Sequence, residues 1–265
     1  MGATRAELLA TARRSLTAAG AHDRAGWLGL FTDDGCVRDP VGSRPHHGRV
    51  AIGHFYDTFI GPRDIGHHPH IDIVTDETVV RDLELEIQMA SNLIMKVPTY
   101  IRYDLRAESG ELRIAGLSAY WELPAMIRRY LRGGFGALPA GIALGRAMLT
   151  NQGLSGSLGF ISGLRGLGSA GKALFGRLLD ETCGGDEIGL RRLAADIPIT
   201  LGDAEPLSTS DLIKHLSGGT WHKMIRSGRA VAARVDNNGE PFVLIGDLAA
   251  DPTAISRIRL FGEIR

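Results

Sequence analysis

Apolar residues recur at helical spacing through the first sixty residues, and this pattern predicts an opening group of helices. A first helix is expected over residues 5–21. Asp23 is a good N-cap for a second helix that runs through Phe31. Residues 32–35 have the composition of a turn, residues 36–39 that of a short strand ended by Pro40, and a third helix is expected from Val50.

From residue 71 the pattern changes to the alternation of apolar and polar residues that is typical of strands. Strands are expected over residues 71–74, 79–89, 97–105 and 112–123, with a hairpin turn at residues 108–111. In the third of these strands, one face carries Val97, Thr99, Ile101, Tyr103 and Leu105. Helices followed by an antiparallel sheet with one apolar face indicate an α+β fold in which the helices cover that face.

The last hundred residues repeat this order in shortened form. The expected elements are a helix over 173–182, an Asp186-capped helix, a strand over 197–201, a Ser210-capped helix and strands over 228–235, 241–247 and 254–262. The intervening segment is apolar and unusually rich in glycine. We therefore expect one domain over residues 1–125, a glycine-rich helical linker over 126–170, and a degenerate second copy of the same fold over 171–265.

Composition narrows the classes of partner. Thirty basic and thirty acidic side chains cancel, so the chain lacks the positive charge that nucleic-acid binding requires. The N-terminus has no apolar signal core, and the two cysteines, Cys36 and Cys183, lie too far apart to suggest a disulfide framework. Arg146 and Arg165 interrupt the glycine-rich segment, so we expect no membrane span and a cytoplasmic protein.

One continuous motif carries a family resemblance. Over residues 5–123 the chain resembles the nuclear-transport-factor-2-like (SnoaL-like) superfamily, and within it the ketosteroid-isomerase branch. The likeness rests on Leu30-Phe31-Thr32-Asp33-Asp34-Gly35-Cys36-Val37-Arg38-Asp39-Pro40-Val41-Gly42-Ser43-Arg44-Pro45, then Gly48 and Ala51-Ile52-Gly53-His54-Phe55-Tyr56. The resemblance implies a cone-shaped curved antiparallel sheet, of the cystatin-like type, whose inner face and covering helices enclose a pocket.

The resemblance also implies a chemistry. Asp39 falls on the position of the family's general base, which removes a proton next to a ketone and returns it to another carbon. Tyr56 matches a tyrosine that supports the catalytic phenol. The expected ligand is an apolar carbonyl compound, steroid-like or polyketide-like, and the reaction needs no cofactor or metal. The pocket residues that we assign are Phe55, Phe59, Met89, Ile101, Tyr120 and Trp121.

Two positions depart from the family pattern. Ser15 stands where the first helix normally supplies the catalytic phenol, and Arg102 stands where a strand supplies a protonated carboxyl group. Tyr103 has the inward position by alternation and could substitute, as could Tyr120 or Tyr56. Arg102 is another candidate for stabilising an enolate. In the second copy, Thr200 falls near the place of Asp39, so no base is expected there unless Asp203 takes that place by a three-residue shift.

Three other interpretations remain open. The first is a ligand-binding or scaffold protein that keeps the pocket without the chemistry. The second is an epoxide hydrolase similar to limonene-epoxide hydrolase, which would use Arg102 and Asp104. It also needs a second carboxylate from the last strand, at a place that Ala119 occupies and to which Glu122 lies close. The third concerns assembly, where either a homodimer or an internal pseudo-dimer of the two copies is possible.

His67, His68 and His70 are expected in a solvated loop rather than in a metal site, and the glycine-rich match at 166–172 lacks the context of a phosphate-binding loop.

Overall fold

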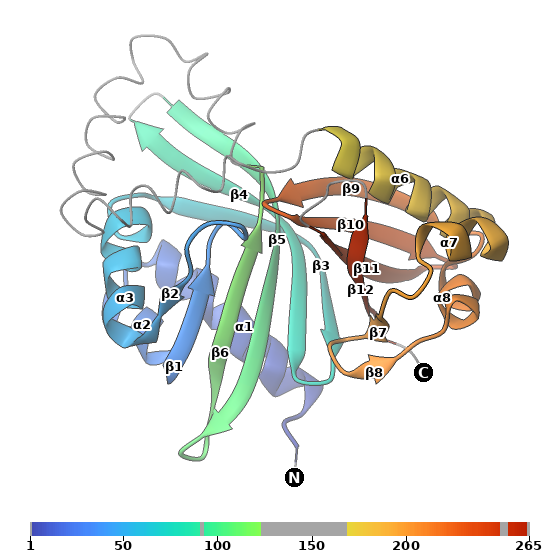
Figure 1. The fold of residues 1–265 in the computed structure, drawn as a ribbon. Helices are drawn as coiled ribbons and strands as arrows, with labels where there is room; N and C mark the ends of the chain where they lie inside the picture. The colour runs from blue at the N-terminus through green and yellow to red at the C-terminus, as the bar shows by residue number, and fades with distance from the viewer. Residues whose placement is uncertain (1, 91–92, 123–168, 250–253, 264–265) are drawn as a thin grey trace.

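The computed structural model describes residues 2–90, 93–122, 169–249 and 254–263, and these residues form two six-stranded sheets (Figure 1). Most of the glycine-rich segment, residues 123–168, lies outside the described residues, so the helical linker remains a prediction. We call the described residues up to 122 the first module and those from 169 the second module. Among the described residues no helix is long and apolar enough to cross a membrane.

The first module begins with helices and continues as a sheet. Its elements are α1 (Arg5–Gly20), α2 (Arg24–Gly29), β1 (Phe31–Arg38), β2 (His46–His47), α3 (Gly48–Phe55) with a π-helical continuation (Tyr56–Ile60), β3 (Ile65–Thr75), β4 (Thr78–Ala90), β5 (Leu93–Glu108) and β6 (Glu111–Tyr120). The strand order is β2-β1-β6-β5-β4-β3, in which β1 runs parallel to β6 and the other neighbours are antiparallel.

The second module repeats this topology. Its elements are α6 (Ser169–Gly184), α7 (Glu187–Leu193), β7 (Ile199–Leu201), β8 (Glu205–Pro206), α8 (Thr209–Leu216), β9 (Thr220–Ser227), β10 (Ala230–Asn237), β11 (Glu240–Leu248) and β12 (Ile255–Phe261). The order β8-β7-β12-β11-β10-β9 corresponds strand by strand to the first sheet, including one parallel pair, β7 with β12. Asp23 and Asp186 cap α2 and α7 in the same way, each accepting from the backbone N–H three residues on. The predicted α+β fold with a second copy is therefore confirmed.

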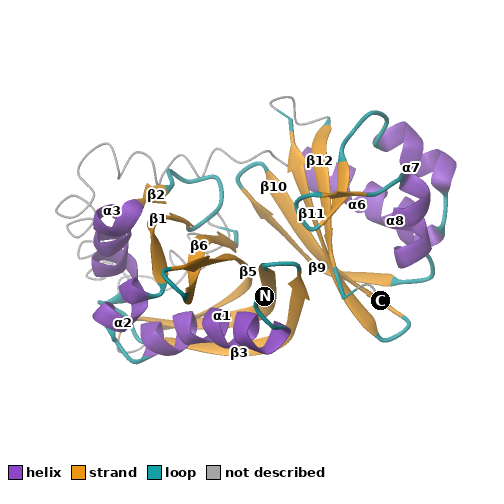
Figure 2. Ribbon diagram, turned by 90° about the horizontal axis from the view of Figure 1, so that it is seen from below, coloured by secondary structure: helices purple, strands orange, loops and turns teal. Residues whose placement is uncertain are grey.

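Each sheet packs its inner face against its own helices, and the two sheets pack against each other through their outer faces. Figure 2 shows α2 and α3 at one end of the molecule and α6–α8 at the other, with both sheets between them and α1 along the lower side of the first module. The apolar cluster between the sheets takes residues from both modules: Ile73, Val80, Tyr100 and Tyr120 from the first, and Ile225, Ala230, Ala232, Val243, Ile245 and Phe261 from the second. Within the chain, the second module thus covers the outer sheet face of the first.

Polar contacts add to this interface. The Tyr100 hydroxyl donates to the carbonyl of Lys223 at 2.9 Å, and Lys223 itself pairs with the buried Asp82 of β4. Thr75 exchanges two hydrogen bonds with the backbone of Gly262, each 3.1 Å long. Because these groups lie far apart in sequence and several are buried, they fix one orientation of the modules.

Several details differ from the sequence-based expectations. The second helix ends at Gly29 rather than at Phe31, and the strand expected over residues 71–74 begins at Ile65. Residues 32–35 do not form a turn but belong to β1, whose pairing with β6 shifts register between Phe31 and Cys36. Strand β9 was not predicted, because its outward and edge positions carry polar residues that hide the alternation. The helix expected to begin at a Ser210 cap is capped by Ser208, which forms a capping box with Asp211.

Candidate functional site

Asp39 directly follows β1, and its hydrogen-bond partner, Trp121, lies 82 residues further along the chain. The indole Nε1 of Trp121 donates a hydrogen bond of 2.6 Å to Oδ1 of Asp39. Trp121 directly follows β6, which pairs with β1 in parallel, so the two residues leave the sheet at the same edge. Trp121 is buried in the inner core of the module, and this places the Asp39 carboxyl group at the inner side of the sheet.

The surroundings of Asp39 favour its neutral form. Removal from water raises the pKa of its carboxyl group to about 6, and the hydrogen bond from Trp121 opposes that rise because it stabilises the carboxylate. The residue as a whole keeps some solvent contact. Such a group is mostly ionised at pH 7, yet it binds a proton more tightly than an ordinary aspartate, which suits it to take up and release the same proton.

Tyr103 is fully buried on the inner face of β5, as the alternation predicted. Its hydroxyl has no hydrogen-bond partner of good geometry among the described residues. Burial raises the pKa of this phenol to about 12, and the nearby charge of Asp39 acts in the same direction. A buried hydroxyl without an acceptor is costly to the folded protein, so this group is well suited to donate to a ligand oxygen.

Two further side chains act on Tyr103, and one of them was missed by the sequence analysis. Ser15 on α1 is buried beside the phenol and lowers its pKa through a side-chain hydrogen bond, although the geometry of this contact falls short of a good hydrogen bond. Arg81 on β4 lowers it more strongly through its positive charge. Arg81 lies two residues before the inward-facing Leu83 on β4, so the alternation of the strand places both side chains on the inner face. The sequence analysis did not use this pattern, because an arginine in a strand is ordinarily taken as exposed.

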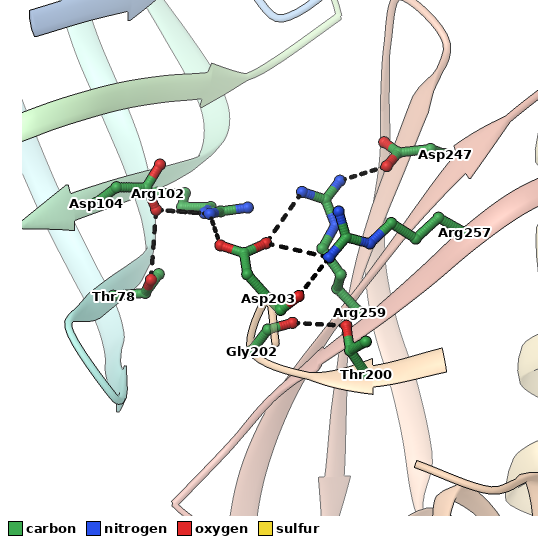
Figure 3. A network of polar contacts seen from close by, with 9 residues as sticks. All are labelled: Thr78, Arg102, Asp104, Thr200, Gly202, Asp203, Asp247, Arg257 and Arg259. Carbon is green, nitrogen blue, oxygen red and sulfur yellow. Dashed lines mark hydrogen bonds and ion pairs between the residues drawn. The ribbon is translucent and has the colours of Figure 1, made fainter. Parts of the chain in front are cut away.

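Arg102 lies on the outer face of β5, so it cannot act together with Asp39. Figure 3 shows its guanidinium directed at Asp104 on the same strand and at Asp203 of the second module. Asp203 also pairs with Arg257 and Arg259 at 3.8 and 3.7 Å. The assignment of Arg102 to the pocket was therefore wrong in placement, because adjacent residues of a strand face opposite sides of the sheet. The epoxide-hydrolase interpretation requires Arg102 and Asp104 in the pocket, but this ion pair lies on the outer face of the sheet.

The remaining predicted pocket residues divide between the two faces. Phe55, Ile101 and Trp121 belong to the inner core, and Phe59 packs against it. Tyr120 lies in the cluster between the two sheets and is not a pocket residue, because it has the opposite parity to its neighbour Trp121. Met89 lies on β4, but its side chain is outside the part of the chain that the structure describes.

Tyr56 is buried against Trp27, with ring centroids 5.3 Å apart. Its hydroxyl has no hydrogen-bond partner among the described residues. Burial raises the pKa of this phenol, and the charges of Asp23 and Asp57 raise it further. These neighbours belong to the α2–α3 side of the module, and a hydrogen bond from Tyr56 to Tyr103 is not present.

The sheet registers show what the second module has at the corresponding positions. In the first sheet, Val37, Leu117, Tyr103 and Val79 form one row across four strands. The matching row of the second sheet is Ile199, Ile258, Gly246 and Val231. Tyr103 thus corresponds to Gly246, and a side chain at Gly246 would collide with the ring of Phe175 on α6.

The same rows identify the counterparts of the other inner residues. Two residues further along each strand, Asp39 and Arg81 correspond to Leu201 and Ala233. Asp203, the alternative counterpart of Asp39, is bound to Arg102 across the module interface. The second module therefore has apolar or small residues where the first has its three polar inner groups.

The second module also contacts the loop that carries Asp39. Ser227 donates to the carbonyl of Val41 at 2.8 Å. Gly42 and Gly228 approach so closely that a Cβ atom on Gly42 would lie 2.4 Å from the Cα of Gly228. Both glycines have positive φ, 95° and 57°. Residues 227 and 228 thus support the loop immediately after Asp39.

No group of three or more His, Cys, Asp or Glu side chains within the described ranges is arranged to hold a metal ion. His67, His68 and His70 belong to β3 rather than to a loop. His68 pairs with Glu86 at 3.2 Å and His70 with Asp82 at 3.3 Å across β3 and β4. Of the glycine-rich match at 166–172, residues 166–168 lie outside the described residues, and Lys172 pairs with Glu122.

Several solved structures of other proteins are similar to part of this chain. RV0760c from Mycobacterium tuberculosis, solved in complex with estradiol-17beta-hemisuccinate, is 24% identical, covers 44% of this chain and 95% of its own, and has a TM-score of 0.41. The Delta 5-3-ketosteroid isomerase from Mycobacterium sp. is 26% identical, with 45% and 95% coverage and a TM-score of 0.41. An M. tuberculosis LEH-like epoxide hydrolase is 16% identical, with 52% and 95% coverage and a TM-score of 0.40.

A protein family, the SnoaL-like domain, matches the chain over residues 12–118. This range contains Ser15, Asp39, Arg81 and Tyr103, and it extends from within α1 to within β6. It ends before the second module. Residues 12–118 of this chain are therefore a SnoaL-like domain.

Proposed function

We propose that the first module binds an apolar carbonyl compound, steroid-like or polyketide-like, and shifts a carbon–carbon double bond by proton transfer through Asp39. The observation that carries the proposal is the pairing of two groups on the inner face of the sheet. One is a carboxyl group whose pKa is raised to about 6, and the other is the buried hydroxyl of Tyr103, which has no hydrogen-bond partner of good geometry among the described residues. The first suits a base and the second suits an oxyanion donor.

The proposed reaction is an isomerisation with no net change in composition. The Asp39 carboxylate takes the proton from the carbon between the carbonyl group and the double bond. The electron pair of that C–H bond moves toward the carbonyl carbon, and the carbonyl oxygen becomes a dienolate oxygen. Tyr103 donates its hydroxyl proton in a hydrogen bond to this oxygen, and the charge of Arg81 favours the same negative species.

The second half of the reaction restores the enzyme. The protonated Asp39 returns its proton to the far carbon of the dienolate, the double bond moves into conjugation with the carbonyl group, and the carboxylate is regenerated. Trp121 holds Asp39 in place through its hydrogen bond of 2.6 Å throughout. The site differs from the ketosteroid-isomerase pattern in that the phenol comes from β5 rather than from α1, where Ser15 stands.

The experiment is a turnover assay with 3-keto-Δ5-steroids, followed by the ultraviolet absorption of the conjugated product. Asp39→Asn and Tyr103→Phe test the two groups. Trp221→Phe is a matched control because Trp221 donates to Asp180 at 2.8 Å in the second module, away from the site. The isomerase proposal fails if the protein does not turn over these substrates, and the assignment of the ligand class fails as well if it binds no member of a steroid panel.

A second candidate function is binding of the same class of ligand without turnover. The observation that favours it is Ser15, which stands where the ketosteroid-isomerase pattern has a phenol, so that among the described residues Tyr103 is left as a single candidate oxyanion donor instead of two. Loss of a single donor costs about 10²–10³ in rate. In that case the steroid binds, Tyr103→Phe weakens binding, and no product forms with any substrate of the panel.

A further inference from the structure

A cavity lies between α1 and β3, and it does not include Asp39, Trp121 or Tyr103 in its lining. It has a volume of about 500 Å³ and is partly open to solvent. Its titratable lining consists of Arg5, Arg13, Arg81, His67 and His70 with one acidic residue, Asp72. We call it the α1–β3 groove. Its size is that of a small-molecule site.

The charges of the α1–β3 groove do not balance. Asp72 accepts from both Arg13, at 2.8 Å, and Arg81, at 2.7 Å. One carboxylate therefore lies between two guanidinium groups, and one positive charge remains. Arg5 pairs with Glu263 of the second module, so this pair is neutral and does not change the charge count of Arg13, Arg81 and Asp72.

Arg81 is the distinctive member of the groove. Its side chain is 2% exposed, although arginine is almost never fully buried without complete pairing. Its Nε donates to Asp72, whereas its Nη1 is buried and has no hydrogen-bond partner among the described residues. A buried cationic N–H without an acceptor is costly, and a bound oxygen would satisfy it.

The neighbouring histidine has properties consistent with an anion site. Burial lowers the pKa of His67, and the positive charge of Arg81 lowers it further. A neutral imidazole can still donate one hydrogen bond to an oxyanion. His67 therefore supplies an uncharged donor next to the two arginines. The Thr17 hydroxyl, which also lines the groove, already donates to the carbonyl of Arg13 at 3.2 Å.

We propose that the α1–β3 groove binds the carboxylate or phosphate group of a small ligand, with Arg81 and Arg13 as its cationic contacts. Both anions present oxygens at the spacing that a guanidinium fork pairs with in bidentate fashion. The site does not depend on the proton-transfer proposal, because neither Asp39 nor Tyr103 lines the groove. Arg81 is the one residue common to both, and toward Tyr103 it acts only through its charge.

The test is an NMR titration of the full chain with two probes, inorganic phosphate and hexanoate, at constant ionic strength set with sodium chloride. The expected result is a saturable shift of the Arg81 Nε–Hε signal and of the Thr17 and His67 amides with at least one probe. If only phosphate saturates the groove, the natural ligand carries a phosphate group, and if only hexanoate does, it carries a carboxylate. Shifts that grow linearly with both probes overturn the proposal.

Variants separate this site from general charge effects. Arg13 is largely exposed, so Arg13→Gln is expected to fold normally and to weaken probe binding by at least about tenfold, or about 1.4 kcal/mol. Arg81→Gln is expected to abolish binding. Arg106→Gln is the matched control, because Arg106 is an exposed arginine paired with Asp34 away from the groove. Unchanged affinity in Arg13→Gln overturns the proposal even if Arg81→Gln does not fold.

Discussion

The indole Nε1 of Trp121 donates a hydrogen bond of 2.6 Å to the Asp39 carboxylate, joining the ends of two parallel strands. The contact has two consequences. It fixes the position of the Asp39 carboxyl group, and it limits how far burial can raise the pKa of that group. The pair therefore sets the pH range over which Asp39 can act as a proton acceptor.

Trp121→Phe should raise the pKa of Asp39 above its value of about 6, because the hydrogen bond stabilises the charged form. Hydrogen bonds to charged groups contribute roughly 1.5–3 kcal/mol, which corresponds to a rise of roughly 1–2 pH units. A carboxyl-carbon NMR titration of Asp39 measures the shift directly. In a turnover assay, the acidic limb of the pH–kcat/KM profile should move to higher pH by the same amount.

Trp221→Phe provides the control for that experiment, since it removes an indole donor from Asp180 and should leave the titration of Asp39 unchanged. If Trp121→Phe leaves the pKa of Asp39 where it is, or lowers it, the hydrogen bond does not stabilise the carboxylate.

Asp39→Asn should stabilise the protein at neutral pH. The folded-state pKa of about 6 lies above the unfolded value of about 3.9, so the folded protein binds this proton more tightly. The resulting stability is present in full below about pH 3.9 and is lost as pH rises through about 6. At pH 8 the ionised Asp39 thus costs roughly 3 kcal/mol, which the amide avoids while still accepting from Trp121.

Urea unfolding at several pH values measures this difference. The advantage of Asp39→Asn over the wild type should grow between about pH 4 and pH 7 and then stay constant. An advantage that is independent of pH would mean that the ionisation of Asp39 is not its source.

Tyr103→Phe should separate function from stability. The hydroxyl makes no good hydrogen bond to the described residues, so its removal should leave the free energy of unfolding unchanged or raise it by roughly 1 kcal/mol. If Tyr103 stabilises the enolate, kcat should fall by about 10²–10³. Parallel kinetics and urea unfolding on the same variant test both statements.

Tyr100→Phe is the matched control on the opposite face of β5. Its hydroxyl donates to Lys223 across the module interface at 2.9 Å, so the variant should lose roughly 1 kcal/mol of stability and keep its turnover. The reverse pattern in the two variants would contradict the assignment of Tyr103 to the site.

The alternation of apolar and polar residues was sufficient to orient β5. It placed Tyr103 and Ile101 on the inner face, and both lie there. The family resemblance put Arg102 at the position of a pocket carboxyl group instead, and this failed because a position matched without gaps carries no information about which face of the strand it lies on. The alternation of side chains along a strand is a physical constraint on which face a residue occupies. Related proteins need not have strands of equal length, so a position matched by counting can fall on the other face.

Other features depended on contacts that no local pattern contains. Trp121 and Asp39 are 82 residues apart, and their hydrogen bond follows from the parallel pairing of β1 with β6. Arg81 is buried because Asp72 lies directly opposite it in the β3–β4 register. A single sequence contains the charges but not this register, so a buried ion pair at this position could not be distinguished from an exposed strand face.

Gly228→Ala tests whether the second module supports the Asp39 loop. A Cβ atom at Gly228 would lie 2.5 Å from the Cα of Gly42, so the two backbones would have to separate. The positive φ of 57° at Gly228 adds a conformational cost of roughly 1–2 kcal/mol. Because Gly42 is three residues from Asp39, we expect the loop to move and the pKa of Asp39 to fall toward its ordinary value as the carboxyl group gains solvent.

Gly239→Ala isolates the conformational cost. Gly239 also has positive φ, 82°, but a Cβ atom there would have nothing within 4 Å. It should lose roughly 1–2 kcal/mol of stability with no change in the titration of Asp39. Gly228→Ala should lose more stability than this and should also lower the pKa of Asp39 in the NMR titration. Equal stability losses with an unchanged Asp39 would show that the second module is a neighbour of the site without being a support for it.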